Sequence, residues 1–253
     1  MTFAAIGARS QSYVTAPLAD GFDYPVGKPD AKNYYTARGF IPHGHMGEDW
    51  NGTGGGNTDE GDPIYNIAHG VVLFSQDYKR GWGNVVIIRH AFRGSNGQIS
   101  FVDSLYGHLK VRLVKVGDKV LRGQKIGTMG CGPHRMYLAH LHFEIRKDLR
   151  VGMRRDLYPK TYATYHSPRY FIDQHRKLRY ESRTVRMPIN TFQKSSNPNK
   201  VYTTKIEVPD VETEAEVKPA VPETVSTVIA SEVEEENATP EKSKSLLEKL
   251  FGK

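Results

Sequence analysis

Two histidines stand one residue apart in the stretch LAHLHFEIR, at positions 140 and 142. Successive side chains of a strand point to opposite faces, so His140 and His142 would project from one face, about 7 Å apart. Glu144 and Arg146 would share that face, and the apolar residues between them would occupy the other. Residues two apart on a helix would diverge, so the alternation favours a strand. Paired imidazoles on one face suit metal binding and proton transfer.

A second motif, PHGHMGEDWNG, places His45 and Asp49 four residues apart. On a strand they would share a face, with room between them because Gly47 has no side chain. Together with His142 they make a set of two imidazoles and one carboxylate that suits zinc. Three protein ligands leave one coordination position open to water, which is the pattern of a catalytic zinc site. We therefore expect one Zn²⁺ per chain, ligated by His45, Asp49 and His142.

Two further histidines are candidates for proton transfer. His140 would lie beside the metal, one step along the strand from His142. His108, in SLYGHLK, ends an apolar strand where packing requires no imidazole. Both are predicted to share general base, general acid and oxyanion-stabilising work in amide hydrolysis, and the choice of base stays open. An isolated HxH or HxxxD pattern is more often structural than metal-binding. In this sequence the two patterns occur together with a third histidine, and this combination favours a metal-binding and catalytic role.

The segments around these motifs read as short β-strands bounded by glycines and polar turns, without helical periodicity. This predicts a mainly β protein with an antiparallel, sandwich-like core. A stretch at residues 167–178 is expected to add a short helix. The strands are expected at residues 70–75, 83–90, 100–109, 119–129 and 138–146.

Composition divides the chain into four parts. We expect an N-terminal extension over 1–16, a folded domain with the histidine and aspartate motifs over 17–180, a basic extension over 181–204 and an acidic tail over 205–253. The tail is rich in Glu, Val, Pro and Thr and buries too little apolar surface to fold, so it is predicted to be disordered. Its last nine residues predict either a frayed end or a short docking helix. The tail is a candidate attachment point for a protein partner.

Charge and cysteine content narrow the classes of function. The 253 residues carry a net charge of +7, although 12 acidic residues and six lysines follow residue 204. A basic body would attract nucleic acid, anionic membrane or cell-wall polymer. Because no nucleic-acid-binding motif is present, we expect no nucleic-acid partner. The single cysteine, Cys131, excludes an internal disulfide. No apolar run reaches 18 residues, so we expect no transmembrane segment, and no clear signal peptide is seen.

The motifs, taken in order, resemble those of the M23 zinc metallopeptidases, which include the lysostaphin and LytM-type peptidoglycan endopeptidases. The resemblance covers about residues 17–175 and rests on HMGED, GWGNVVIIRH, YGHL, VGDKVLRGQKIGTMG and HLHFEIR. It implies the zinc ligands His45, Asp49 and His142 and the catalytic residues His108 and His140, in agreement with the assignment from the residues themselves.

The same resemblance implies hydrolysis of peptide bonds in the stem or cross-bridge peptides of bacterial peptidoglycan, in the cell envelope, periplasmic or secreted. Two alternatives remain. One is a non-catalytic scaffold of this fold that activates another cell-wall hydrolase, and the other is a peptidase that acts on proteins. The complete set of ligands and catalytic histidines favours the enzyme over the scaffold.

Several other residues have less certain roles. Family members use a tyrosine near the site, for which we considered Tyr34, Tyr35 and Tyr106, and latent members fill the open metal position with an asparagine, for which Asn33 is the nearest candidate. Asp59, Glu60 and Asp62 are expected to form a polar turn rather than bind metal. Cys131 and His134 have no assigned role, and a loop position for Cys131 is favoured over an inhibitory metal ligand.

Overall fold

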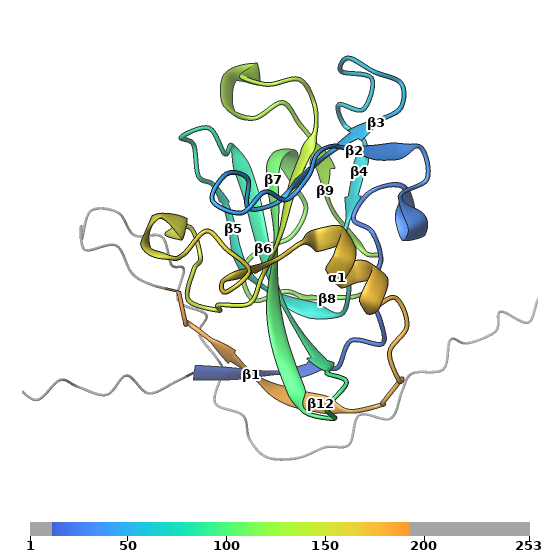
Figure 1. Cartoon of the computed structure of the whole chain (residues 1–253), viewed down its shortest axis with the longest axis vertical. Helices are drawn as coiled ribbons and strands as arrows, with labels where there is room; N and C mark the ends of the chain where they lie inside the picture. Colours follow the sequence, from blue (N-terminus) through green and yellow to red (C-terminus); the bar gives the residue numbers. More distant parts are fainter. Residues whose placement is uncertain (1–11, 193–253) are drawn as a thin grey trace, which may run out of the picture. The chain divides into compact units, whose positions relative to one another are not determined.

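The computed structural model describes residues 12–192, and within them the chain is mainly β with every strand pair antiparallel (Figure 1). The predicted fold class is confirmed for this part. The acidic tail and its terminal segment lie outside the described residues.

Ten strands form the main sheet. Three short strands lie off its central path, where β11 (Tyr165–His166) pairs with β10, β9 (Lys125–Met129) pairs with β7, and β4 (Pro63–Tyr65) pairs with β9. The central path runs in the order β2 (Tyr34–Arg38), β3 (Glu48–Gly52), β10 (Leu141–Arg146), β7 (Ile99–Arg112), β6 (Asn84–Arg93), β5 (Gly70–Asp77) and β8 (Lys119–Val120). Short helical turns occur at Gly27–Ala31, Pro133–Arg135 and Arg155–Leu157, and α1 spans Pro168–Gln174.

A separate two-stranded ribbon joins the two ends of the described chain. β1 (Ser12–Pro17, blue) pairs with β12 (Thr184–Ile189, orange), and Ser12 lies opposite Ile189 (Figure 1). The two boundaries expected for the domain over 17–180 therefore lie at or near β1 and β12, which pair with each other. Composition gave no sign of this pairing, because the partners are more than 160 residues apart in sequence.

The central strands are buried on both faces, which explains the continuous apolar run NVVII in β6. On one face Val86 and Ile88 belong to a core cluster with Phe22 and with Phe171 of α1. On the other face Val85 and Ile87 pack in a cluster that includes residues of the ribbon. The sheet is thus held between α1 on one side and the ribbon on the other.

Three local predictions need correction. The strand expected over residues 119–129 is interrupted by a turn between β8 and β9. His45 does not lie on a strand with Asp49, because β3 starts at Glu48 and His45 forms an isolated bridge with Ile41. His140 lies just before β10, in a bridge with Gly130. The helix expected over 167–178 is present and shorter, and its first residue is Pro168, a residue favoured at that position.

Candidate metal centre

Three neighbouring strands bring the candidate residues together. In the register of β10, His142 lies opposite Asp49 of β3 on one side and opposite Gly107 of β7 on the other. Asp49, His142 and His108 therefore come from adjacent positions in the order β3, β10, β7. His45 reaches the same place through the turn before β3, where the backbone at Gly47 approaches β10 closely. A Cβ atom at Gly47 would lie 2.4 Å from the carbonyl oxygen of Phe143 and 3.1 Å from His142 Cε1.

The side chains of His45, Asp49 and His142 converge on one point. His142 Nδ1 lies 2.8 Å from Asp49 Oδ1, and His45 Nε2 lies 3.1 Å from each of these two atoms. Both histidines are buried. These three residues form a group of potential ligands whose donor atoms all lie within 4.8 Å of one another.

The hydrogen bonds on the far side of each ring determine which nitrogen faces this point. His45 Nδ1 lies 2.9 Å from the carbonyl oxygen of Gly39, which can only accept, so Nδ1 carries the proton. His142 Nε2 lies 3.0 Å from Glu144 Oε1 and donates to that carboxylate. The two nitrogens that face Asp49 are then both acceptors.

This donor set fits a zinc ion. Three acceptor atoms about 3 Å apart repel one another unless a proton or a cation lies between them. Zinc bonds of about 2.0–2.1 Å in a tetrahedron separate the ligand atoms by about 3.3 Å. The observed separations of 2.8–3.1 Å are close to that value. Two imidazoles and one carboxylate are also the ligand types found in zinc sites that keep one position open.

A row of charged side chains supports His142 from behind. Glu144, fully buried two residues further along β10, also accepts hydrogen bonds from Arg146 Nε at 2.7 Å and from Arg155 at 3.1 Å. Burial opposes ionisation of Glu144, but Arg146, His142 and Arg155 hold the pKa of its carboxyl group well below the usual range. A carboxylate behind a ligating histidine fixes the ring and makes it a stronger base.

The same contacts set the charges of the ligands. Burial opposes ionisation of Asp49, yet the contacts of its carboxylate with His142 and His45, which strengthen when a ring is protonated, hold the pKa of this carboxyl group well below the usual range. Burial also opposes protonation of His142, but its bonds to Asp49 and Glu144 raise its pKa overall. A metal ion would therefore compete with a proton for His142.

His108 and His140 lie side by side next to this group, with ring centroids 4.8 Å apart. The Nδ1 of His108 lies 3.1 Å from the carbonyl oxygen of Trp82, and that of His140 lies 2.8 Å from the carbonyl oxygen of Leu138. Both rings therefore carry the proton on Nδ1 and keep Nε2 as an acceptor. His140 Nε2 lies 3.9 Å from Asp49 Oδ1.

Two properties set His108 apart. Its backbone has φ of +60°, a left-handed conformation that costs a non-glycine residue about 1–3 kcal/mol and is frequent at functional sites. Burial, with the neighbouring His142 and His140, lowers the pKa of His108 to about 3. His108 is thus a neutral imidazole with an open acceptor at neutral pH. Trp82 supports it, since their rings stack with centroids 6.1 Å apart.

The sequence analysis missed Tyr137, which lies against the outer side of the two histidines. Its ring centroid is 4.9 Å from that of His108 and 5.8 Å from that of His140. Two asparagines hold the backbone after it, because Asn57 Oδ1 accepts the N–H of Ala139 at 2.7 Å and Asn51 Nδ2 donates to the Ala139 carbonyl at 3.1 Å. Tyr137 lies outside the alternating segment of β10, so the only sequence signal for it was its position shortly before His140.

The other candidates lie elsewhere. Tyr106 is in the core, with its hydroxyl 3.1 Å from Ser104 Oγ, and Tyr34 donates to Asp62. Tyr35 of β2 is half exposed and pairs with Asn51. Asn33 precedes β2, and its carbonyl oxygen accepts the N–H of Thr53.

The polar residues after β3 form a turn, as expected, and none of them belongs to the ligand group. Asp59 accepts the N–H of Gly52 at 2.8 Å and closes the Gly-rich loop. Glu60 pairs with Lys110 and Arg135. Cys131 is buried beside Asn57 and is likewise no member of the group His45, Asp49 and His142.

Comparison with known proteins identifies the family of the segment that carries the candidate site. The family model described as "Peptidase family M23" matches residues 44–154, the segment that contains all five histidine and aspartate candidates. The lipoprotein NlpD of Yersinia enterocolitica is 36% identical over 86 residues, which are 34% of this chain and 78% of that protein. The chain belongs to peptidase family M23.

Two other relatives of this M23 chain carry different descriptions. The peptidoglycan DD-endopeptidase ShyC of Vibrio cholerae is 45% identical over 84 residues, or 33% of this chain and 17% of ShyC. The murein hydrolase activator NlpD of Salmonella dublin is 30% identical over 139 residues, or 53% of this chain and 34% of that protein. The chain thus spans about a sixth of the first and a third of the second. Among the described residues, no helix has the length and hydropathy to cross a membrane.

Proposed function

We propose that this M23 protein is a zinc-dependent endopeptidase that hydrolyses peptide bonds in the stem or cross-bridge peptides of bacterial peptidoglycan. One observation carries the proposal. Three acceptor atoms from His45, Asp49 and His142 face one another at 2.8–3.1 Å, and two further histidines with open Nε2 atoms flank them. A non-catalytic fold has no need for this arrangement.

His45, Asp49 and His142 would hold the zinc ion. When bound, zinc supplies Lewis-acid chemistry, which polarises a carbonyl group and lowers the pKa of water. The Asp49 carboxylate offsets part of the ion's charge, and Glu144 behind His142 keeps that ring oriented and basic.

The two flanking histidines would move protons and stabilise charge. His108 is neutral and has an open Nε2, so it is suited to accept a hydrogen bond from the attacking water and to orient it. A group with a pKa of about 3 is a weak base, so the proton of that water would pass to His140. His140 also has an open Nε2 and, once protonated, would donate a hydrogen bond to the developing oxyanion or a proton to the leaving amine. Tyr137 packs on both rings and limits their motion.

A second candidate function is activation of another cell-wall hydrolase, which the description of the Salmonella relative as a murein hydrolase activator supports. An activator needs the fold and a docking surface, and it needs no proton-transfer residues beside a metal site. The presence of both histidines therefore favours the enzyme. A third candidate, hydrolysis of protein substrates, uses the same chemistry and differs in what binds along the site.

The test is to measure zinc content together with the release of new amino groups from purified peptidoglycan. We expect about one zinc per chain and release by the wild type. The His142→Ala variant should lose both zinc and activity, whereas His108→Ala and His140→Ala should keep zinc and lose turnover. Full activity in any of these three variants would refute the assigned roles.

Two controls separate the alternatives. Casein in place of peptidoglycan tests the protein substrate. To test for an activator, the rate of an added cell-wall amidase is measured with and without the His140→Ala variant. Zinc-loaded wild type that releases no amino groups alone, and yet stimulates the amidase, would favour the activator.

The proposed substrate also sets the location and partner. Peptidoglycan lies outside the cytoplasmic membrane, so we propose that the protein works in the cell envelope. The lipoprotein description of the Yersinia relative is consistent with that location. Fractionation of cells that express the full chain, followed by detection in the envelope fraction, tests it.

A further inference from the structure

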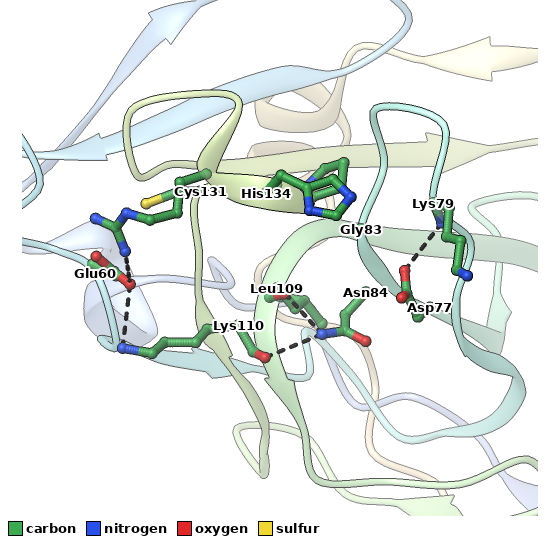
Figure 2. Close-up of a pocket in the computed structure, with 12 residues that line it drawn as sticks. Glu60, Asp77, Lys79, Gly83, Asn84, Leu109, Lys110, Cys131 and His134 are labelled. Atoms are coloured by element: carbon green, nitrogen blue, oxygen red, sulfur yellow. Dashed lines mark hydrogen bonds and ion pairs between the residues drawn. The ribbon is translucent and has the colours of Figure 1, made fainter.

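A cavity of about 510 Å³ lies beside the candidate site and takes no part in the mechanism above (Figure 2). Its walls come from the β5–β6 turn, the end of β7 and the loop that precedes β10. Asn84 fixes the wall, because its Nδ2 donates to the carbonyl oxygens of Leu109 and Lys110 at 3.2 and 3.1 Å. These hydrogen bonds hold the β6 and β7 sides of the cavity together.

The cavity adjoins His108. Leu109, in its lining, is the next residue in β7, and Gly83 follows Trp82, whose carbonyl oxygen accepts from His108. A Cβ atom at Gly132, also in the lining, would lie 3.5 Å from His108 Nδ1. A peptide cleaved at the zinc site would thus have its next groups within reach of this cavity.

Its charged groups favour an anion. Lys79, Lys110 and Arg135 line the cavity together with two carboxylates, Glu60 and Asp77. Asp77 accepts the backbone N–H of Lys79 at 3.0 Å. Within residues 12–192, Glu60 is the carboxylate that pairs with both Lys110, at 3.2 Å, and Arg135, at 2.8 Å. Figure 2 shows the pair of Glu60 with Lys110. An ammonium has three donors and a guanidinium five, so both cations keep N–H groups for a ligand.

We propose that this cavity is a substrate subsite that binds a free carboxylate of the peptide, on the His108 side of the cleaved bond, through Arg135 and Lys110. The proposal rests on the proposed function. The stem peptides of peptidoglycan present carboxylates, and charge-assisted hydrogen bonds to Arg and Lys are the strong ones. In this arrangement Glu60 has two roles, since it positions both cations and competes with the ligand for them.

Binding distinguishes this role from a structural one. Two soluble cross-linked muropeptides, identical except that the carboxyl groups of one are amidated, are titrated into the full-length His140→Ala protein, which serves as the uncleaving background. We expect the free acid to bind roughly tenfold more tightly than the amide. Arg135→Gln should remove most of this preference. Glu60→Gln should increase it, because it releases both cations for the ligand.

Arg150→Gln is the matched control. Arg150 is as exposed as Arg135, with 66% against 62% of the side chain accessible, and it also pairs with one carboxylate, Asp148. It lies on the loop after β10, outside this cavity, and should leave the preference unchanged.

The proposal predicts opposite changes in the preference for the free acid, a decrease in Arg135→Gln and an increase in Glu60→Gln. A purely structural ion pair would weaken binding of both muropeptides in both the Arg135 and Glu60 variants. Any of three results would overturn the subsite. The His140→Ala background could bind both muropeptides with equal affinity, it could bind neither, or Arg135→Gln could keep the full preference for the free acid. Amine release by the wild type is scored separately and bears on the proposed function alone.

Discussion

The Nε2 atom of His142 lies 3.0 Å from Glu144 Oε1, so a histidine of the candidate metal centre and its supporting carboxylate stand two residues apart on one strand. The pleat of β10 places both side chains on the same face. This relationship makes Glu144 a positioning residue of the candidate metal centre, although it is not one of the three potential ligands.

We expect Glu144→Gln to weaken zinc binding by roughly 10- to 100-fold, because the amide holds the His142 ring without making it more basic. Competition with a chromogenic chelator measures this affinity. Arg155→Gln is the control, since it removes another partner of Glu144 and leaves the bond to His142 intact. Equal zinc affinity in wild type and Glu144→Gln would contradict the role.

Gly47→Ala should disrupt the centre by crowding. The added methyl group would lie 2.4 Å from the backbone oxygen of Phe143, and backbone cannot move aside cheaply. We expect a loss of about 1–3 kcal/mol in the free energy of unfolding, together with weaker zinc binding. Gly39→Ala in the same segment meets nothing within 4 Å and is the control. Urea denaturation of both variants gives the comparison.

Asn57→Ala should lower turnover and leave zinc bound. It removes the acceptor for the N–H of buried Ala139, the residue before His140. A loss of about 1 kcal/mol in positioning corresponds to roughly a fivefold lower kcat. Asn96→Ala, in the exposed β6–β7 turn, serves as the control. A kcat equal to that of the wild type would show that the Gly-rich loop does not position His140.

Stability should rise with pH between about 4 and 6.5 because of His90. Burial lowers the pKa of this histidine from 6.5 to about 4, and its ring bonds to His69 and Ser104 inside the core. Within this window the unfolded chain binds more protons than the folded one, so the free energy of unfolding increases with pH, by about 3 kcal/mol in total.

Urea denaturation of the metal-free protein at pH 4.5, 5.5 and 7 measures this slope. His90→Gln should reduce the rise in the free energy of unfolding by about 3 kcal/mol, whereas His43→Gln on the surface should leave it unchanged. Burial also lowers the pKa of His166 to about 4 and that of His108 to about 3, and both add to the slope. Burial raises the pKa of Glu48 to about 7, which subtracts from the slope, and these contributions are the same in all three proteins. A curve that keeps its full slope in His90→Gln would assign the effect to other groups.

The sequence predicted which residues lie together at the candidate site better than it predicted the path of the chain. Alternation in LHFEIR indicated correctly which side chains share a face, because the pleat of a strand is a local property. It also selected His45 and Asp49, but by the wrong geometry, since His45 comes from a turn whose shape depends on the contact of Gly47 with β10.

Contacts between distant segments were beyond reach of the sequence. Tyr137 approaches His108 through a loop held by Asn57, about 80 residues earlier in the chain. Likewise, Arg155, the second arginine that pairs with Glu144, lies in the short helical turn Arg155–Leu157 after the strand. Such contacts are set by tertiary packing, and no local periodicity records them.

The pairing of Ser12 with Ile189 means that the two ends of the described body meet at one end of the ribbon. The fold is therefore nearly a closed circle, and the position at which the chain is cut is not dictated by the sheet. A short peptide joining these ends, with new termini in the exposed turn at residues 94–98, would give a circular permutant that keeps every strand pair. Such a variant would also place any fused domain at the β6–β7 turn instead of at the ribbon.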